Sequence, residues 1–170
     1  MKRYIFKILV AGEGGAGKTS LLQRYVDDKF EDSNVLTVGV DFFTKEIAYD
    51  NVECLFQLWD LGGQKRFRNL LDNFVMGARG ALLLFDLTRM PNVNDILEWV
   101  NISRIHDMNL PILLIGTKLD LDEYIAVDDD SALHLKNTFN MVDYIKTSAK
   151  NGYNVEKVFE AMAKTLISLN

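Results

Sequence analysis

The hydrophobic positions of this chain follow two alternating patterns: short continuous apolar runs, and longer segments in which apolar residues recur every three or four positions. The continuous runs predict buried strands and the periodic segments predict helices. The predicted parallel strands are residues 5–10, 81–85, 111–115 and 142–145, and the predicted helices are 21–26, 93–100, a segment beginning near Asp128, and 155–167. Such alternation is typical of a largely parallel sheet covered on both faces.

Two further apolar runs, Val40–Tyr49 and Val52–Trp59, are rich in aromatic and β-branched residues and are separated only by Asp50 and Asn51. This pair suits a tight hairpin turn, so the two strands should be antiparallel neighbours at one edge of the sheet. Residues 31–34 have no periodicity and predict a loop, and residues 65–76 predict an irregular helical segment. The expected fold is α/β, with six strands, one of them an antiparallel edge strand, and about five helices.

The composition predicts one domain over residues 1–170. A chain of 170 residues that is 48% hydrophobic can fill one core but is too short for two ordinary domains. The net charge of −5 argues against a broad surface for nucleic acid or anionic membranes. We expect a monomer that does not bind nucleic acid.

The single cysteine and the chain ends predict a cytoplasmic protein. Cys54 cannot form an internal disulfide, and its apolar surroundings favour a buried residue over a reactive thiol. Lys2 stands where myristoylation requires glycine, and no 18-residue apolar run is present. The last residues, Ser168, Leu169 and Asn170, include no cysteine for prenylation. We therefore expect no intrinsic membrane anchor, with recruitment to membranes only through partners.

The strongest candidate for chemistry is GEGGAGKT, Gly12–Thr19, which fits the pattern G-x-x-x-x-G-K-S/T between a predicted strand and a predicted helix. Its glycines let backbone N–H groups point inward around phosphate. Lys18 adds a positive charge, Thr19 offers a hydroxyl to Mg²⁺, and the following helix directs its positive end at the site. The alternative, a glycine-rich turn without a ligand, does not require this strand-to-helix context.

Three other polar segments follow predicted strands: Asp60, Thr117–Asp120 and Thr147–Lys150. One aspartate at a strand end is usually only a cap. Three such segments indicate a ligand site, because parallel strands present their carboxyl ends at one edge of the sheet. Asp60 suits a supporting role at Mg²⁺, which keeps several waters and takes few protein ligands.

Together these motifs resemble the small GTPases of the Ras superfamily over essentially the whole chain. GEGGAGKT resembles the phosphate loop, TKLD (residues 117–120) the guanine-reading motif, and SAK (residues 148–150) the base-supporting loop. Thr37 resembles the switch I threonine, Asp60, Gly63 and Gln64 resemble the switch II D-x-x-G-Q, and Phe30 matches the aromatic residue at the guanine edge. The resemblance implies a P-loop NTPase G domain that binds GTP or GDP with Mg²⁺.

The residues that this resemblance assigns to the nucleotide and metal can be given together. The nucleotide residues are Gly14, Gly15, Ala16, Gly17, Lys18, Thr19, Ser20, Phe30, Thr37, Gly63, Thr117, Lys118, Asp120, Ser148, Ala149 and Lys150. The metal residues are Thr19, Thr37 and Asp60.

Within the superfamily, Rab proteins are the nearest match. VGVDF, FQLWD, RFRNL and FVMGARG, at residues 38–42, 56–60, 66–70 and 74–80, resemble Rab signature segments. Leu61 and Gly62 are Arf-like, and Thr117 in place of asparagine is Rho-like. A Rab's membrane cycle depends on C-terminal cysteines, so the resemblance implies a signalling or trafficking regulator without specifying vesicle traffic.

The implied reaction is slow GTP hydrolysis by in-line attack of water, with Lys18, Thr37, Gly63 and Gln64 as catalytic residues. Arg66 and Arg68 are expected to be surface residues of switch II. Partners would be an exchange factor, an activating protein and effectors at the switch regions. The alternatives are a scaffold that binds GTP without turnover, and an adenine-using ATPase or kinase, against which Asp120 argues.

Three aromatic residues, Phe42, Trp59 and Phe74, match an aromatic triad that Rab effectors contact. Large aromatic side chains are usually buried, so the alternative is that all three fill the core. Their positions beside the two switch segments predict a partly exposed partner patch instead.

Overall fold

The computed structural model describes residues 1–31, 39–63, 68 and 70–170, and its centre is a six-stranded sheet in the order β2-β3-β1-β4-β5-β6. The strands are β1 (Lys2–Gly12), β2 (Val40–Tyr49), β3 (Val52–Leu61), β4 (Gly80–Asp86), β5 (Ile112–Thr117) and β6 (Asp143–Lys146). The α-helices of the described ranges are α1 (Lys18–Asp27), α2 (Asp72–Val75), α3 (Val93–Ser103), α4 (Asp129–Thr138) and α5 (Val155–Ser168). This arrangement confirms the predicted fold class.

The hairpin at the sheet edge forms as predicted. β2 pairs with β3 antiparallel from Val40–Leu61 to Tyr49–Val52, and the other strand pairs are parallel. Asp50 and Asn51 both have positive φ, 48° and 60°. Asparagine and aspartate tolerate this conformation, and two such residues give the turn whose twist matches the flanking strands.

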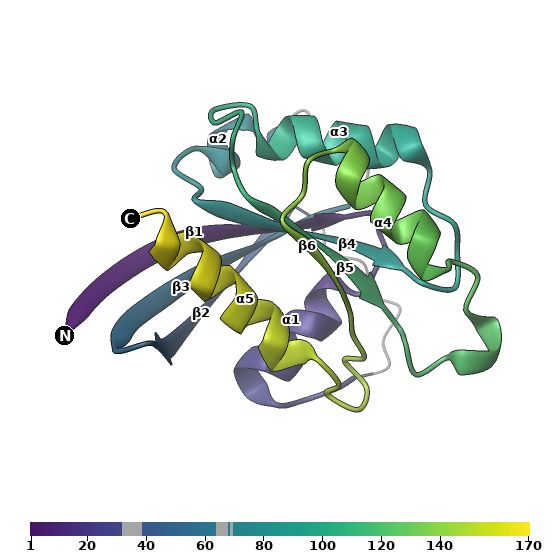
Figure 1. Cartoon of the computed structure of the whole chain (residues 1–170), viewed down its shortest axis with the longest axis horizontal. Helices are drawn as coiled ribbons and strands as arrows, with labels where there is room; N and C mark the ends of the chain where they lie inside the picture. Colours follow the sequence, from purple (N-terminus) through teal and green to yellow (C-terminus); the bar gives the residue numbers. More distant parts are fainter. Residues whose placement is uncertain (32–38, 64–67, 69) are drawn as a thin grey trace.

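Both faces of the sheet are covered, with α1 and α5 on one side and α2, α3 and α4 on the other (Figure 1). On the first face Phe159 of α5 stacks on Tyr25 of α1 with ring centroids 3.6 Å apart. On the second face the buried Trp99 of α3 fills the space over the sheet. Cys54 is buried on β3, which confirms its predicted burial.

Several predicted boundaries differ from the structure by a few residues. β1 begins at Lys2 rather than Ile5, because its polar first residues pair with β3 from Val52 onward, and backbone hydrogen bonding leaves no hydrophobic signal. Of the helical segment predicted at 65–76, the described part contains an α-helix only at Asp72–Val75. None of the helices in the described ranges is long and apolar enough to cross a bilayer.

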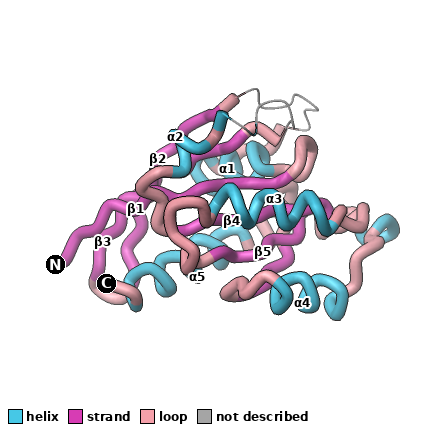
Figure 2. Tube along the Cα trace, turned by 90° about the horizontal axis from the view of Figure 1, so that it is seen from above, coloured by secondary structure: helices cyan, strands magenta, loops and turns pink. Residues whose placement is uncertain are grey.

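The direction of the strands decides where the loops meet. Figures 1 and 2 show the N- and C-termini at the same end of the sheet. β1, β3, β4, β5 and β6 are mutually parallel, so their carboxyl ends all lie at the opposite end. The polar segments predicted from the sequence therefore converge there.

Candidate functional site

The phosphate loop joins β1 to α1 and is held from both sides. Gly12, with φ 144°, passes so close to the Leu84 carbonyl of β4 that a Cβ would overlap it. Thr117 Oγ1 at the end of β5 donates to the Ala16 carbonyl at 2.7 Å. Gly17 at the N-cap of α1 has φ 89°, a conformation that favours glycine. Neighbouring strands thus hold the loop in place.

Lys18 lies beneath this loop and is 5% exposed. Its Nζ donates to the carbonyl oxygens of Gly12 and Glu13, each at 2.8 Å. Burial lowers the pKa of Lys18 to about 8, although the charge of Asp60 acts in the opposite direction. Because the charge of Asp60 offsets the burial of the ammonium only in part, Lys18 favours an incoming anion, and this position is suited to phosphate.

Thr19 and Asp60 meet next to Lys18. Thr19 Oγ1 at the start of α1 donates to Asp60 Oδ2 of β3 at 2.6 Å, and Asp60 is fully buried. A hydroxyl and a carboxylate are hard oxygen ligands of the kind that Mg²⁺ prefers. No cluster of three or more His, Cys, Asp or Glu side chains with metal-site geometry occurs within the described ranges. Thr37, the third predicted metal residue, lies outside the described residues.

The segment after β3 lies directly over the phosphate loop. A Cβ built on Gly63 would overlap the Gly14 amide and the Glu13 backbone, so only glycine fits this approach. The Gly62 amide donates to the Gly39 carbonyl at 2.6 Å, which ties the segment to the start of β2. Gln64, the predicted water-orienting residue, lies outside the described residues.

Lys118 connects the loop after β5 to the phosphate loop. Its backbone has φ 65°, and its Nζ donates to the Gly15 carbonyl at 2.9 Å and to Asp86 Oδ2 at 2.8 Å. Burial raises the pKa of Asp86, but hydrogen bonds from Lys118 and Thr88 outweigh it and lower the pKa overall. No role was predicted for Asp86, although its position at the end of a buried strand was an available signal.

Asp120, in the loop after β5, lies next to the loop after β6. The Ser148 hydroxyl donates to Asp120 Oδ1 at 2.8 Å, and the Ser148 amide donates to the Tyr153 carbonyl at 3.1 Å. Ser148 is buried, whereas Asp120 and Ala149 are only partly buried. Phe30, which is also partly buried, follows α1. A carboxylate oriented by a hydroxyl and left accessible can accept hydrogen bonds from a ligand.

The expectation for Arg68 was wrong. Arg68 is 4% exposed, and its guanidinium lies over the Trp99 ring with 4.6 Å between Cζ and the ring centroid. It donates to Glu98 at 2.9 Å, to Asp95 at 3.3 Å and to the Gly63 carbonyl at 3.1 Å. The carboxylates of α3 pair with the buried guanidinium. Because these carboxylates and Trp99 are distant from Arg68 in sequence, the local pattern around Arg68 does not reveal its burial. Arg66 lies outside the described residues.

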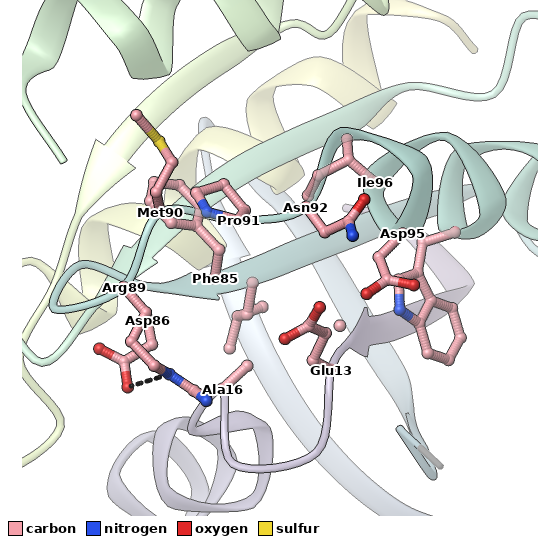
Figure 3. Close-up of a pocket in the computed structure, with 13 residues that line it drawn as sticks. Glu13, Ala16, Phe85, Asp86, Arg89, Met90, Pro91, Asn92, Asp95 and Ile96 are labelled. Carbon is pink, nitrogen blue, oxygen red and sulfur yellow. Dashed lines mark ion pairs between the residues drawn. The ribbon is translucent and has the colours of Figure 1, made fainter. Parts of the chain in front are cut away.

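A cavity of about 140 Å³ lies on the α3 side of the phosphate loop (Figure 3). Glu13 and Asp95 border it, and the pKa of Glu13 is raised, mainly by a hydrogen bond with Asp95. The Arg89 guanidinium pairs with Asp86 at 3.8 Å on the rim. Lys118, Asp120 and Ser148 do not line this cavity, so it is separate from the predicted base site.

The three aromatic residues of the predicted patch do lie together. The Trp59 centroid is 5.0 Å from that of Phe42 and 6.0 Å from that of Phe74. Phe42 is 45% exposed, Phe74 is 39% exposed, and Trp59 is partly buried. Lys7 Nζ lies 4.5 Å from the Trp59 centroid and donates to the Met76 carbonyl at 2.8 Å. We call Phe42, Trp59 and Phe74 the aromatic patch.

Comparison with known proteins agrees with this architecture. The family model described as "Ras family" matches residues 7–168. A Ras-related protein Rab-1 of Theileria parva is 41% identical over 165 residues, which cover 96% of this chain and 74% of that protein. Ras-related protein RABD2c of Arabidopsis thaliana is 36% identical over 164 residues, covering 96% and 81%. Ras-related protein Rab-1D of Dictyostelium discoideum is 37% identical over 164 residues, covering 96% and 80%. With these matches and the phosphate loop in its strand-to-helix setting, the chain belongs to the Ras family of small GTPases and is Rab-like.

Proposed function

We propose that this protein is a guanine-nucleotide switch that binds GTP or GDP with Mg²⁺, hydrolyses GTP slowly and binds partners according to the nucleotide. The observation that carries the proposal is that Lys118 bridges the phosphate loop, at the Gly15 carbonyl, to the loop that bears Asp120. A direct contact therefore joins the groups proposed to bind phosphate to those proposed to bind the base.

The phosphate end of the proposed site relies on charge. Lys18 and the amides of the phosphate loop would stabilise the β- and γ-phosphates. Mg²⁺, when bound, supplies positive charge that neutralises the phosphates. Thr19 would hold the ion, and Asp60 would support this metal site. Thr37 would complete the metal site, and the Gly63 amide would bind the γ-phosphate.

The base end of the proposed site relies on hydrogen-bond complementarity. Guanine presents two neighbouring donors, the ring N1–H and the exocyclic amine, and one acceptor, O6. Asp120 would accept from both donors, and amides of the Ser148–Lys150 loop would donate to O6. Thr117 supports this end through its hydrogen bond to Ala16, and Phe30 would flank the base.

Hydrolysis is tested by Gln64→Leu. We expect this variant to keep its GTP affinity and to hydrolyse GTP at least about tenfold more slowly, because it loses the group that orients water but keeps the phosphate cradle. Single-turnover hydrolysis, with affinity measured in parallel, checks the prediction. Thr19→Asn is the contrasting variant and should weaken GTP binding more than GDP binding. Equal measurable turnover in the wild type and Gln64→Leu would mean that another residue orients the water, and negligible turnover in both would favour the GTP-binding scaffold.

Partner binding is tested at the aromatic patch. We propose that this patch binds effectors of a Rab-like signalling or trafficking regulator, since exposed apolar clusters mark partner surfaces. Trp59→Ala should weaken binding of a GTP-state partner by about 2 kcal/mol and leave nucleotide affinity unchanged. Titration calorimetry measures both quantities. Tyr124→Ala, an exposed aromatic outside the patch, is the control. Unaltered partner affinity in Trp59→Ala would place effector binding elsewhere.

A further inference from the structure

Arg24 of α1 connects that helix to the loop after β6, across more than 120 residues of sequence. Its Nε donates to the Ala149 carbonyl and its Nη2 to the Lys150 carbonyl, both at 2.7 Å. The Arg24 side chain is 19% exposed. A planar guanidinium that bonds two successive carbonyls fixes their orientation as well as their distance.

The same loop carries unused donors. The amides of Ala149 and Lys150 donate to no group in the part of the chain that the structure describes. In a trans peptide the C=O and N–H point in opposite directions, so a bond from Arg24 to the Ala149 carbonyl turns the Lys150 N–H away from α1. The Gly152 amide holds the Ser148 carbonyl at 2.9 Å and orients the Ala149 N–H in the same manner.

These donors lie next to the proposed guanine reader. Ser148 links the loop to Asp120 through a 2.8 Å hydrogen bond. Asp120 complements the two donors of guanine but offers nothing to O6, which needs a hydrogen-bond donor. The Ala149 and Lys150 amides are the neighbouring groups of the right polarity.

We propose that Arg24 is a positioning residue for guanine recognition, which holds the 149–150 backbone so that its amides reach O6. This inference rests on the proposed guanine-nucleotide function. Arg24 itself does not touch the base.

A second contact of Arg24 suggests another role for this residue, which is to stabilise the end of α1. Nη1 pairs with Asp28 at 2.9 Å, but the Asp28 side chain is 90% exposed. Exposed ion pairs contribute little to stability. If this helix-end pair were the whole role of Arg24, its loss would affect all nucleotides alike.

The test combines a protein substitution with a change of ligand atom. Arg24→Gln removes the two-carbonyl bridge, and its affinity is measured for GDP, inosine diphosphate and 6-thioguanosine diphosphate by displacement of a fluorescent nucleotide. Inosine diphosphate keeps O6 and lacks only the exocyclic amine. The thio analogue keeps both guanine donors, but its sulfur is a weak acceptor.

The chain offers a matched control in Arg104. Its guanidinium also donates to three backbone carbonyls, those of Leu110, Phe139 and Asn140 at 3.1, 2.7 and 3.0 Å. These contacts join the end of α3 to the end of α4, away from Asp120 and Ser148. Arg104→Gln therefore loses the same kind of hydrogen bonds without touching the 149–150 loop.

We expect Arg24→Gln to raise the Kd for GDP and for inosine diphosphate about tenfold, and the Kd for the thio analogue less than about threefold. Arg104→Gln should leave all three within about twofold. Equal losses for GDP and the thio analogue, or no loss for GDP, would contradict the positioning role. Arg24→Lys, which keeps the charge but cannot bridge two carbonyls, decides the question if Arg24→Gln unfolds. If the wild-type protein bound GDP and ADP equally well, the proposed function itself would be ruled out. If the wild type preferred GDP and Arg24→Gln kept that preference unchanged, only this inference would be ruled out.

Discussion

GTP is expected to bind this protein roughly 10⁴–10⁵-fold more tightly than ATP. The reason is Asp120, whose carboxylate is oriented by the Ser148 hydroxyl at 2.8 Å. Adenine has no ring N–H and presents its amine where guanine has O6, so its binding would leave a desolvated carboxylate unpaired. Competition binding with both nucleotides, at fixed Mg²⁺, measures the ratio.

The same argument predicts a change of specificity in Asp120→Asn. The asparagine carbonyl can keep the hydrogen bond from Ser148, so its NH₂ group would face the base. That donor clashes with the exocyclic amine of guanine and complements the O2 carbonyl of xanthine. Preference should therefore move from GTP to XTP. Asp122→Asn, an exposed neighbour, serves as control and should bind GTP normally. Similar ATP and GTP affinities in the unmodified protein would rule out the base assignment.

Lys18→Met is expected to lower nucleotide affinity by about 10²–10³-fold while changing the stability of the nucleotide-free protein by less than about 2 kcal/mol. The two effects separate because Lys18 is buried and its pKa is lowered to about 8. The substitution removes the unfavourable desolvation of an ammonium, which offsets the loss of two hydrogen bonds to Gly12 and Glu13. With nucleotide bound, the phosphate loses its buried counter-charge.

Calorimetric titration with GDP and thermal unfolding without nucleotide measure these two quantities. Lys157→Met on the exposed side of α5 controls for loss of a positive charge from the surface. Unchanged GDP affinity in Lys18→Met would mean that the phosphates do not bind above Lys18. A large loss of stability of the nucleotide-free protein would mean that Lys18 has a mainly structural role.

The sequence by itself determined the elements whose cause is local. The hairpin formed at Asp50 and Asn51 because these residues accept positive φ and the flanking strands alternate. Asp128 begins α4 because its carboxylate accepts from the Ser131 amide, a bond that needs only a three-residue spacing. The phosphate loop was recognisable because its glycines, lysine and threonine act within eight consecutive residues.

Only the tertiary structure determined which side chains make contacts between segments that are distant in sequence. Arg68 is buried because it pairs with Asp95 and Glu98 of α3. These residues lie 27 and 30 positions away in sequence, so only the fold brings them to Arg68. Lys118 reaches the phosphate loop across 103 residues, and Arg24 reaches the 149–150 loop across 125 and 126. An arginine or lysine has the same local pattern in solvent or in such a contact, because the long flexible side chain takes its position from whatever acceptors the fold brings near it.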